Sequence, residues 1–378
     1  MRTVSWTAYL FMACLGYLIY GIGFITPYVR HDLGVSAWVA ALPNSVMAIG
    51  LVGGGAVASR VNARVGARLG IRMWSACMAL ACGLLAIPAF LPILLGALAF
   101  GLAGGGMLVH VNSALGTGPR GGMLLTRANL WSEAGALAGP LVLSAAAARL
   151  GWWFGLLVPA PFLLALVLLL PASPARDLPE MGGVPRASLP RSFWRVWLFL
   201  VLVIGAEFSF VVWAAQVVVA RAGMSLDAAT GLASLFVAGM VAGRFLLSTR
   251  HHAGRRQIAL LRGGAIVALA GALLTWLAAS PVPAGLGLLL GGLGISGMYP
   301  LGASLAIALA PGAPIRASAR LTAASGVAIF AAPLGLGFGV SLLGVVGAWL
   351  FVVGMLLVGL VMLAAMPAPS TAVRGADA

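Results

Sequence analysis

The 378-residue sequence contains no lysine and few acids: its 22 basic residues are all arginine, and seven residues are Asp or Glu. The phosphate-binding loop of an ATP-driven motor needs a lysine on the phosphates. A retinal Schiff base needs a lysine amine. The composition therefore excludes a chain that is its own ATP motor and a rhodopsin-like pump.

Cysteine and histidine are also scarce. Cys14, Cys77 and Cys82 lie in apolar stretches with no metal-ligand spacing, which is typical of small core residues. A membrane-embedded enzyme acting on lipids needs acids, histidines or metal ligands that converge at one interface. The four histidines and seven acids are mostly scattered in loops. We expect no metal, no cofactor and no enzymatic activity.

Charged residues make up 8% of the chain and hydrophobic residues 62%, with a mean hydropathy of +1.10. A soluble domain has about a quarter of its residues charged, so most of this surface must face lipid. The net charge of +15 could favour nucleic acid binding. A basic patch needs a soluble face, however, so we expect a bilayer and no nucleic acid as partner.

A helix of about 20 apolar residues crosses a bilayer, and Arg, Pro and Gly clusters divide the sequence into twelve such stretches. We keep the first as a helix because no signal-peptide cleavage site follows it. The sequence predicts an all-α integral membrane protein. The expected spans are 6–28, 37–58, 71–90, 91–112, 127–149, 151–170, 193–220, 226–249, 257–279, 281–310, 317–343 and 345–366.

The arginines predict the orientation of these spans. If the N-terminus is cytoplasmic, Arg30, Arg149 and Arg221 lie on outer loops and the other nineteen on the cytoplasmic side. Such an imbalance is the positive-inside pattern. We therefore predict a multi-pass protein whose two termini are both cytoplasmic.

Shifting the sequence by 189 residues places its second half on its first. Two six-helix halves related by a parallel repeat form one large class of transporters, although chance matches are common in Gly- and Ala-rich sequence. We predict an N-terminal half at 1–170, a cytoplasmic linker at 171–192, a C-terminal half at 193–366 and a short tail at 367–378. The residues that coincide are Gly34, Ser36, Ser45, Gly50 and Gly54 with Gly223, Ser225, Ser234, Gly239 and Gly243.

Polar residues recur in every third span, in spans one, four, seven and ten. We expect these helices to line a central cavity, with the apolar spans three, six, nine and twelve against lipid. Alternatively, the same residues are ordinary interhelical hydrogen bonders or, for the tyrosines, core packing. The substrate-cavity candidates are Tyr9, Tyr17, Tyr20, His110, Asn112, Asn129, Trp213 and Tyr299.

The stretch Leu33-Gly34-Val35-Ser36 opens span two and is followed by a small-residue helix and a basic loop. It resembles the first signature of the major facilitator superfamily. Three stretches of the second half, 205–209, 239–244 and 294–300, are similar to its fucose-permease-like or actinobacterial branch. The resemblance implies a secondary transporter of the bacterial cytoplasmic membrane, a monomer in which two halves rock about a midplane site.

Two departures from the family pattern concern gating. Ala63 stands where the family usually has an Asp before Gly66, so the charge pairing that holds one state is in doubt. The antiporter-type signature of span five matches at its end and lacks its upstream glycine. The conformational-gating candidates are Arg64, Arg68, Gly135, Gly139, Pro140 and Arg244.

Two acids, Glu133 and Glu207, lie well within predicted spans. Burying an ionised carboxylate in a bilayer costs several kcal/mol, so each must pair, face water or hold a proton. A proton held in one state and released in another ties a proton gradient to alternating access. Both are our proton-coupling candidates, although a neutral Glu hydrogen-bonded to a neighbouring helix is the structural alternative.

The sequence thus predicts secondary active transport of a small organic solute, coupled to protons. The span-five signature slightly favours efflux by antiport over uptake by symport. We see no Arg at the midplane, which favours a neutral or cationic solute. The alternatives are a non-transporting receptor on the same fold and, less favoured, a membrane-embedded lipid enzyme.

Overall fold

The fold is all-α, as the sequence predicts. The computed structural model describes residues 2–65, 67–116, 121–169, 189–248, 255–310 and 314–365. Fifteen helices and no strand occur within these ranges. The predicted linker and tail fall almost wholly outside the described residues.

The helices follow the predicted spans closely. The N-terminal half contains α1 (Arg2–Phe24), α2 (Thr26–Asp32), α3 (Ala37–Val65), α4 (Ala67–Leu85), α5 (Phe90–Gly116), α6 (Gly121–Ala147), α7 (Trp152–Leu157) and α8 (Ala160–Leu169). The C-terminal half contains α9 (Arg191–Ala222), α10 (Leu226–Ser248), α11 (Arg255–Leu277), α12 (Pro281–Ile295), α13 (Met298–Ala308), α14 (Pro314–Ala348) and α15 (Leu350–Ala364).

Local breaks explain why fifteen helices correspond to twelve predicted spans. Span one continues into the short α2, span six breaks at Pro159, and span ten breaks at Gly297. The chain turns at Gly344, whose φ of 69° is in the left-handed region, so span twelve begins inside the bounds of α14. Nine of the described stretches are long and apolar enough to cross a membrane, and three shorter apolar helices complete the twelve.

Glycines matched by the 189-residue shift occupy equivalent helix contacts. A Cβ on Gly54 of α3 would overlap the carbonyl oxygen of Leu102 in α5. A Cβ on Gly239 of α10 would likewise overlap the carbonyl oxygen of Leu289 in α12. Small residues let membrane helices approach this closely. The pairs α3–α5 and α10–α12 are thus built in the same way.

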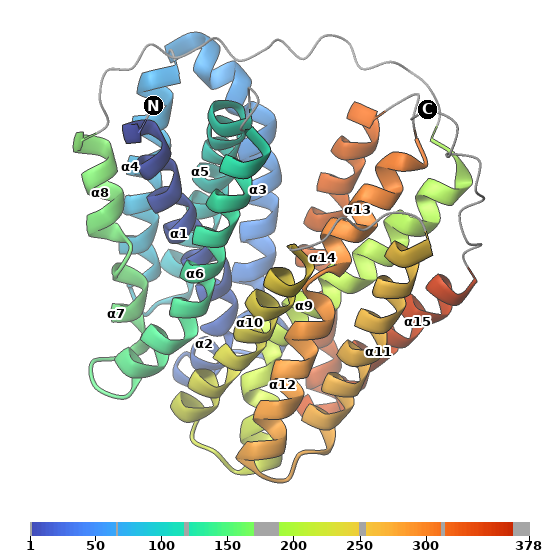
Figure 1. Cartoon of the computed structure of the whole chain (residues 1–378). Coiled ribbons are helices and arrows are strands. Elements are labelled where there is room, and N and C mark those ends of the chain that lie inside the picture. The colour runs from blue at the N-terminus through green and yellow to red at the C-terminus, as the bar shows by residue number, and fades with distance from the viewer. Residues whose placement is uncertain are drawn as a thin grey trace, which may run out of the picture.

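The two halves lie side by side, and α1 and α9 begin at the same end of the bundle (Figure 1). The short helix α2 lies towards the opposite end, which we call the α2 end. Three long helix pairs make most of the contact between the halves, α1 with α9, α3 with α14 and α6 with α10, and the short α2 adds a contact with α9. A site between the halves is therefore expected along these pairs.

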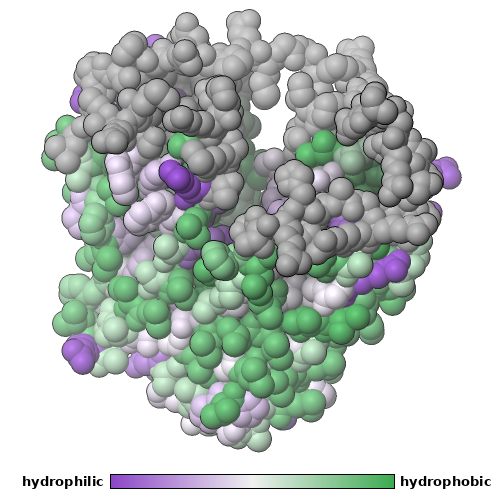
Figure 2. All heavy atoms as spheres, in the orientation of Figure 1, coloured by the Kyte–Doolittle hydropathy of each residue, from purple (hydrophilic) through white to green (hydrophobic). Residues whose placement is uncertain are grey.

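Large apolar side chains cover much of the outer surface. Figure 2 shows hydrophobic residues over most of the coloured face and few hydrophilic ones. Leu168, Val282 and Leu342 are each more than three-quarters exposed. Extended apolar surface of this kind marks contact with a membrane or a partner, in agreement with a membrane-spanning bundle.

Candidate functional site

A cluster of polar side chains joins the two halves near the middle of the bundle. The Tyr20 hydroxyl of α1 donates to Oε1 of Glu207 in α9, with 2.6 Å between the oxygens. Arg244 of α10 forms an ion pair with Glu133 of α6. Met240 lies one turn before Arg244, and its sulfur is 3.7 Å from the Tyr20 hydroxyl oxygen. We call these five residues the central cluster.

The position of Glu207 follows from close packing of α9 against two neighbours. A Cβ on Gly23 of α1 would lie 2.6 Å from the Val211 side chain, so glycine permits the approach of α1 to α9. A Cβ on Gly205 would lie 2.8 Å from Ala332 of α14. Small residues thus hold α9 at the seam between the halves, where Glu207 is 8% exposed.

The opposite faces of α6 contact different neighbours. Gly135 packs against α1, where a Cβ would overlap the carbonyl oxygen of Ala13. Residues two apart on a helix are separated by about 200°, so Glu133 points away from α1. It reaches Arg244, whose Nε also donates to the Ser296 carbonyl oxygen at 3.3 Å. The side chains of Glu133 and Arg244 are 12% and 33% exposed, so the pair is not sealed from its surroundings.

The charges of the central cluster do not balance when both acids are ionised. Arg244 neutralises Glu133, whose second oxygen is buried and has no hydrogen-bond partner. In the described part of the chain, Glu207 has the Tyr20 hydroxyl as partner and no cation. An ionised carboxylate there costs several kcal/mol unless water or a bound cation solvates it. Glu207 is therefore the acid best placed to hold a proton.

Arg244 reaches deeper than the sequence interpretation assumed. Glu133 lies near the middle of α6, and the guanidinium of Arg244 extends to it from the last turns of α10. The sequence showed no Arg at the midplane because it gives the position of the backbone and not the reach of this long side chain.

The other cavity candidates are dispersed. Tyr9 is buried and packs edge-on against Trp6, and the Tyr17 hydroxyl donates to the Gly155 carbonyl oxygen inside the N-terminal half. Trp213 is fully buried and donates to the Pro333 carbonyl oxygen inside the C-terminal half. The side chains of these residues thus make contacts within a half, whereas that of Tyr20 joins the two.

Four further candidates lie on other helices. His110 is buried in α5, and Tyr299 is 37% exposed on α13. Asn129 is exposed on α6, one turn before Glu133 on the same face. The side chain of Asn112 lies outside the described residues.

The gating candidates also separate. Gly135 and Gly139 of α6 approach backbone oxygens of α1, and Pro140 is buried in the same helix. Arg64 is exposed at the end of α3. The side chain of Arg68 lies outside the described residues, so the basic loop of the family pattern is only partly described.

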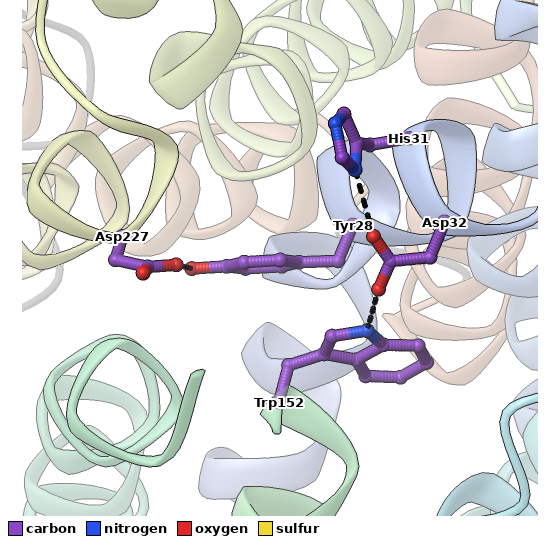
Figure 3. A network of polar contacts seen from close by, with 5 residues as sticks. All are labelled: Tyr28, His31, Asp32, Trp152 and Asp227. Atoms are coloured by element: carbon purple, nitrogen blue, oxygen red, sulfur yellow. Dashed lines mark hydrogen bonds and ion pairs between the residues drawn. The ribbon is translucent and has the colours of Figure 1, made fainter. Parts of the chain in front are cut away.

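A second network closes the α2 end, and the sequence interpretation missed it. The Tyr28 hydroxyl donates to Asp227 of α10 at 3.0 Å, and Arg30 donates to Gln216 of α9 at 2.8 Å. Figure 3 shows the Tyr28 ring extended towards Asp227 and flanked by the indole of Trp152. These partners are about two hundred residues apart in sequence, and no motif signals them.

Asp32 fixes α2 to the N-terminal half. One of its oxygens accepts the Trp152 indole N–H at 2.8 Å, and the other lies 2.7 Å from His31 (Figure 3). The helix that carries Tyr28 and Arg30 is therefore held on its own side while both side chains reach across.

The pair α3–α14 adds cross-half bonds on the same side. Asn44 donates to the Ile329 carbonyl oxygen at 3.0 Å and Ser45 to that of Phe330 at 2.8 Å. Trp38 stacks on Phe338 with 5.2 Å between ring centres. Among the described residues, cross-half hydrogen bonds thus lie at the central cluster or towards the α2 end, and the halves are closed at that end.

A family model described as Major Facilitator Superfamily matches residues 6–313. The chain belongs to the major facilitator superfamily. Its fold is that of a membrane transporter, and the expectation that it is not an enzyme is confirmed. The finer assignment to a fucose-permease-like or actinobacterial branch stays a prediction.

Solved transporters of this superfamily share the fold. A mutant of the nucleoside transporter NupG has a TM-score of 0.76 at 14% identity, over 95% of this chain and 98% of that one. A second match is a bacterial homolog of the human lysosomal transporter Spinster, in an inward-facing and unoccupied conformation. It has a TM-score of 0.70 at 13% identity, over 96% of this chain and 95% of that one.

The human organic anion transporter MFSD10 has a TM-score of 0.65 at 17% identity, over 96% of this chain and 99% of that one. A comparison with curated proteins gave no match. At such low identity the likeness extends to the fold and not to the solute.

Proposed function

We propose that this superfamily member moves small organic solutes by alternating access and couples that movement to protons. Efflux by antiport is favoured over uptake by symport, and the protein acts as a monomer in a bacterial cytoplasmic membrane. The hydrogen bond between Tyr20 and Glu207 carries this proposal, because it places a buried acid on the seam that must move.

Protonation of Glu207 changes the strength of that link. A hydrogen bond to an ionised carboxylate is about twice as strong as one between neutral groups. Ionised Glu207 therefore holds α1 and α9 together, and a proton weakens the connection. Proton binding is in this way tied to the relative position of the halves.

The closed α2 end fits one state of the proposed cycle. With both termini in the cytoplasm, the α2 end faces outward, and the structure corresponds to a state closed to the outside. Transport then requires the bonds of Tyr28, Arg30, Asn44 and Ser45 to break as the opposite end closes.

Flux measurements test this proposal. Purified protein in liposomes is offered radiolabelled solutes of neutral, cationic and anionic class under an imposed pH gradient, as wild type, Glu207→Gln and Glu133→Gln. We expect gradient-dependent flux in the wild type that is lost in Glu207→Gln. Unchanged gradient dependence in both variants would overturn the coupling, and solute binding without flux would favour a receptor.

A further inference from the structure

The charges around Glu207 restrict the solute that can bind there. The central cluster contains two carboxyl groups and one guanidinium, and the guanidinium is paired with Glu133. The carboxyl group of Glu207 is left without a cationic partner among the described residues. The site is electrically neutral when Glu207 carries a proton, or when a single positive charge replaces that proton.

Two aromatic rings and a thioether lie beside the hydrogen bond between Tyr20 and Glu207. Phe208 lies next to Glu207 in the chain, and its ring centre is 5.9 Å from that of Tyr20. The thioether sulfur of Met240 lies 3.7 Å from the Tyr20 hydroxyl oxygen. Aromatic faces stabilise cations, and polarisable thioethers adapt to apolar substituents.

A neutral polar solute finds few partners in these groups. Sugars and nucleosides are selected by buried donors and acceptors that match their hydroxyl and amide groups. Beside Glu207, the Tyr20 hydroxyl is already bound to the carboxyl group, and the Met240 sulfur is only a weak acceptor.

An anionic solute is disfavoured for a different reason. Its natural partner is Arg244, which is bound to Glu133 and to the Ser296 carbonyl oxygen. Displacing Glu133 would leave a largely buried carboxylate without its cation, which is unfavourable.

We infer that the solute is a monovalent organic cation that replaces the proton on Glu207, so that one proton leaves as one cation binds. The Glu207 carboxylic acid gives its proton to water, and the resulting carboxylate pairs with the cation, so that charge is conserved at the site. This inference rests on the proposed proton-coupled transport and specifies its solute and its exchange ratio.

Proton release on binding tests the inference without any need for flux. Tetraphenylphosphonium and tetraethylammonium are titrated into the detergent-solubilised protein by calorimetry, in two buffers with different ionisation enthalpies. We expect release of about one proton per bound cation in the wild type. Release is lost in Glu207→Gln and retained in the control Thr275→Val, whose hydroxyl bonds within α11.

Uridine and p-aminohippurate serve as neutral and anionic probes in the same titration. Three results would overturn the inference. The first is cation binding without proton release, and the second is equal release from Glu207→Gln. The third is binding of uridine or p-aminohippurate while neither cation binds. If a neutral probe is transported along the pH gradient in a Glu207-dependent way, the solute is not a cation but the proposed proton-coupled transport holds. Failure of the inference is therefore distinguishable from failure of the proposed function.

Discussion

Tyr20 and Tyr17 lie one turn apart on α1, yet their hydroxyl groups bind different partners. Tyr20 bonds across the seam to Glu207, whereas Tyr17 bonds to Gly155 within the N-terminal half. The chemistry proposed here therefore depends on one oxygen atom of one tyrosine. At the residue scale the neighbouring tyrosine provides a matched comparison.

Removing that oxygen is expected to slow transport. In Tyr20→Phe the ring stays and Glu207 loses its donor, a change worth about 1.5 kcal/mol or more for a hydrogen bond to a charged group. We expect gradient-driven flux in liposomes to fall by about tenfold. Tyr17→Phe is the control and should keep its flux; equal loss in both variants would argue against a special role for Tyr20.

The partly buried ion pair makes a second prediction at this scale. Glu133→Gln or Arg244→Gln alone leaves one charge unpaired and should lower the free energy of unfolding, by up to about 3 kcal/mol because the pair is only partly exposed. The double variant leaves no charge, so it should lose less than the sum of the two single losses. Thermal unfolding in detergent gives the stability of the wild type, the two single variants and the double variant. Strictly additive losses would contradict a direct pair.

The sequence was sufficient to find the acids but not their partners. Glu133 and Glu207 are conspicuous because charged residues are rare in apolar spans. Their pairing with Arg244 and Tyr20 depends on how helices far apart in the chain face one another, and helical periodicity carries no information on that. For the same reason the bonds of Tyr28 and Arg30 were not foreseen.

At the scale of helices, small residues determine how close neighbours lie. Gly135→Ala would drive a methyl group into the backbone of α1, so we expect the free energy of unfolding to fall by about 2 kcal/mol. Gly83→Ala in α4 is the control, because no atom lies within 4 Å of its added Cβ. Alanine favours helix there by about 0.5 kcal/mol or more, so an equal loss in both would contradict the packing account.

Helix positions were the most predictable feature of the fold. Apolar length and Arg-rich punctuation located the twelve spans because the bilayer imposes a fixed apolar length on each. The breaks inside spans six and ten and the turn at Gly344 were less visible. They depend on single Pro and Gly residues whose conformation is decided by the neighbouring helices.

At the scale of the whole molecule, the structure is held closed at the α2 end. Replacing Tyr28 by Phe and Arg30 by Gln together removes two of its cross-half bonds and should favour the state open at that end. Spin labels at the exposed residues Ser36 and Ala228 report the distance between the halves. We expect a longer distance to become populated, and an unchanged distribution would contradict a gating role.

The same label pair tests most directly whether proton binding at Glu207 drives the motion. Cys14, Cys77 and Cys82 are first replaced by Ala, so that the labels react with no native cysteine. Ser36 and Ala228 are then each replaced by Cys to carry the labels. Distances are then measured from acidic to alkaline pH in this background and in the same background with Glu207→Gln, a residue that cannot ionise.

Alkaline pH should favour the short distance in the parent, because ionised Glu207 binds Tyr20 more strongly, and acidic pH should populate the longer one. The Glu207→Gln protein should show the longer distance at every pH. An identical pH response in both proteins would contradict the central claim that this carboxyl group couples protons to alternating access.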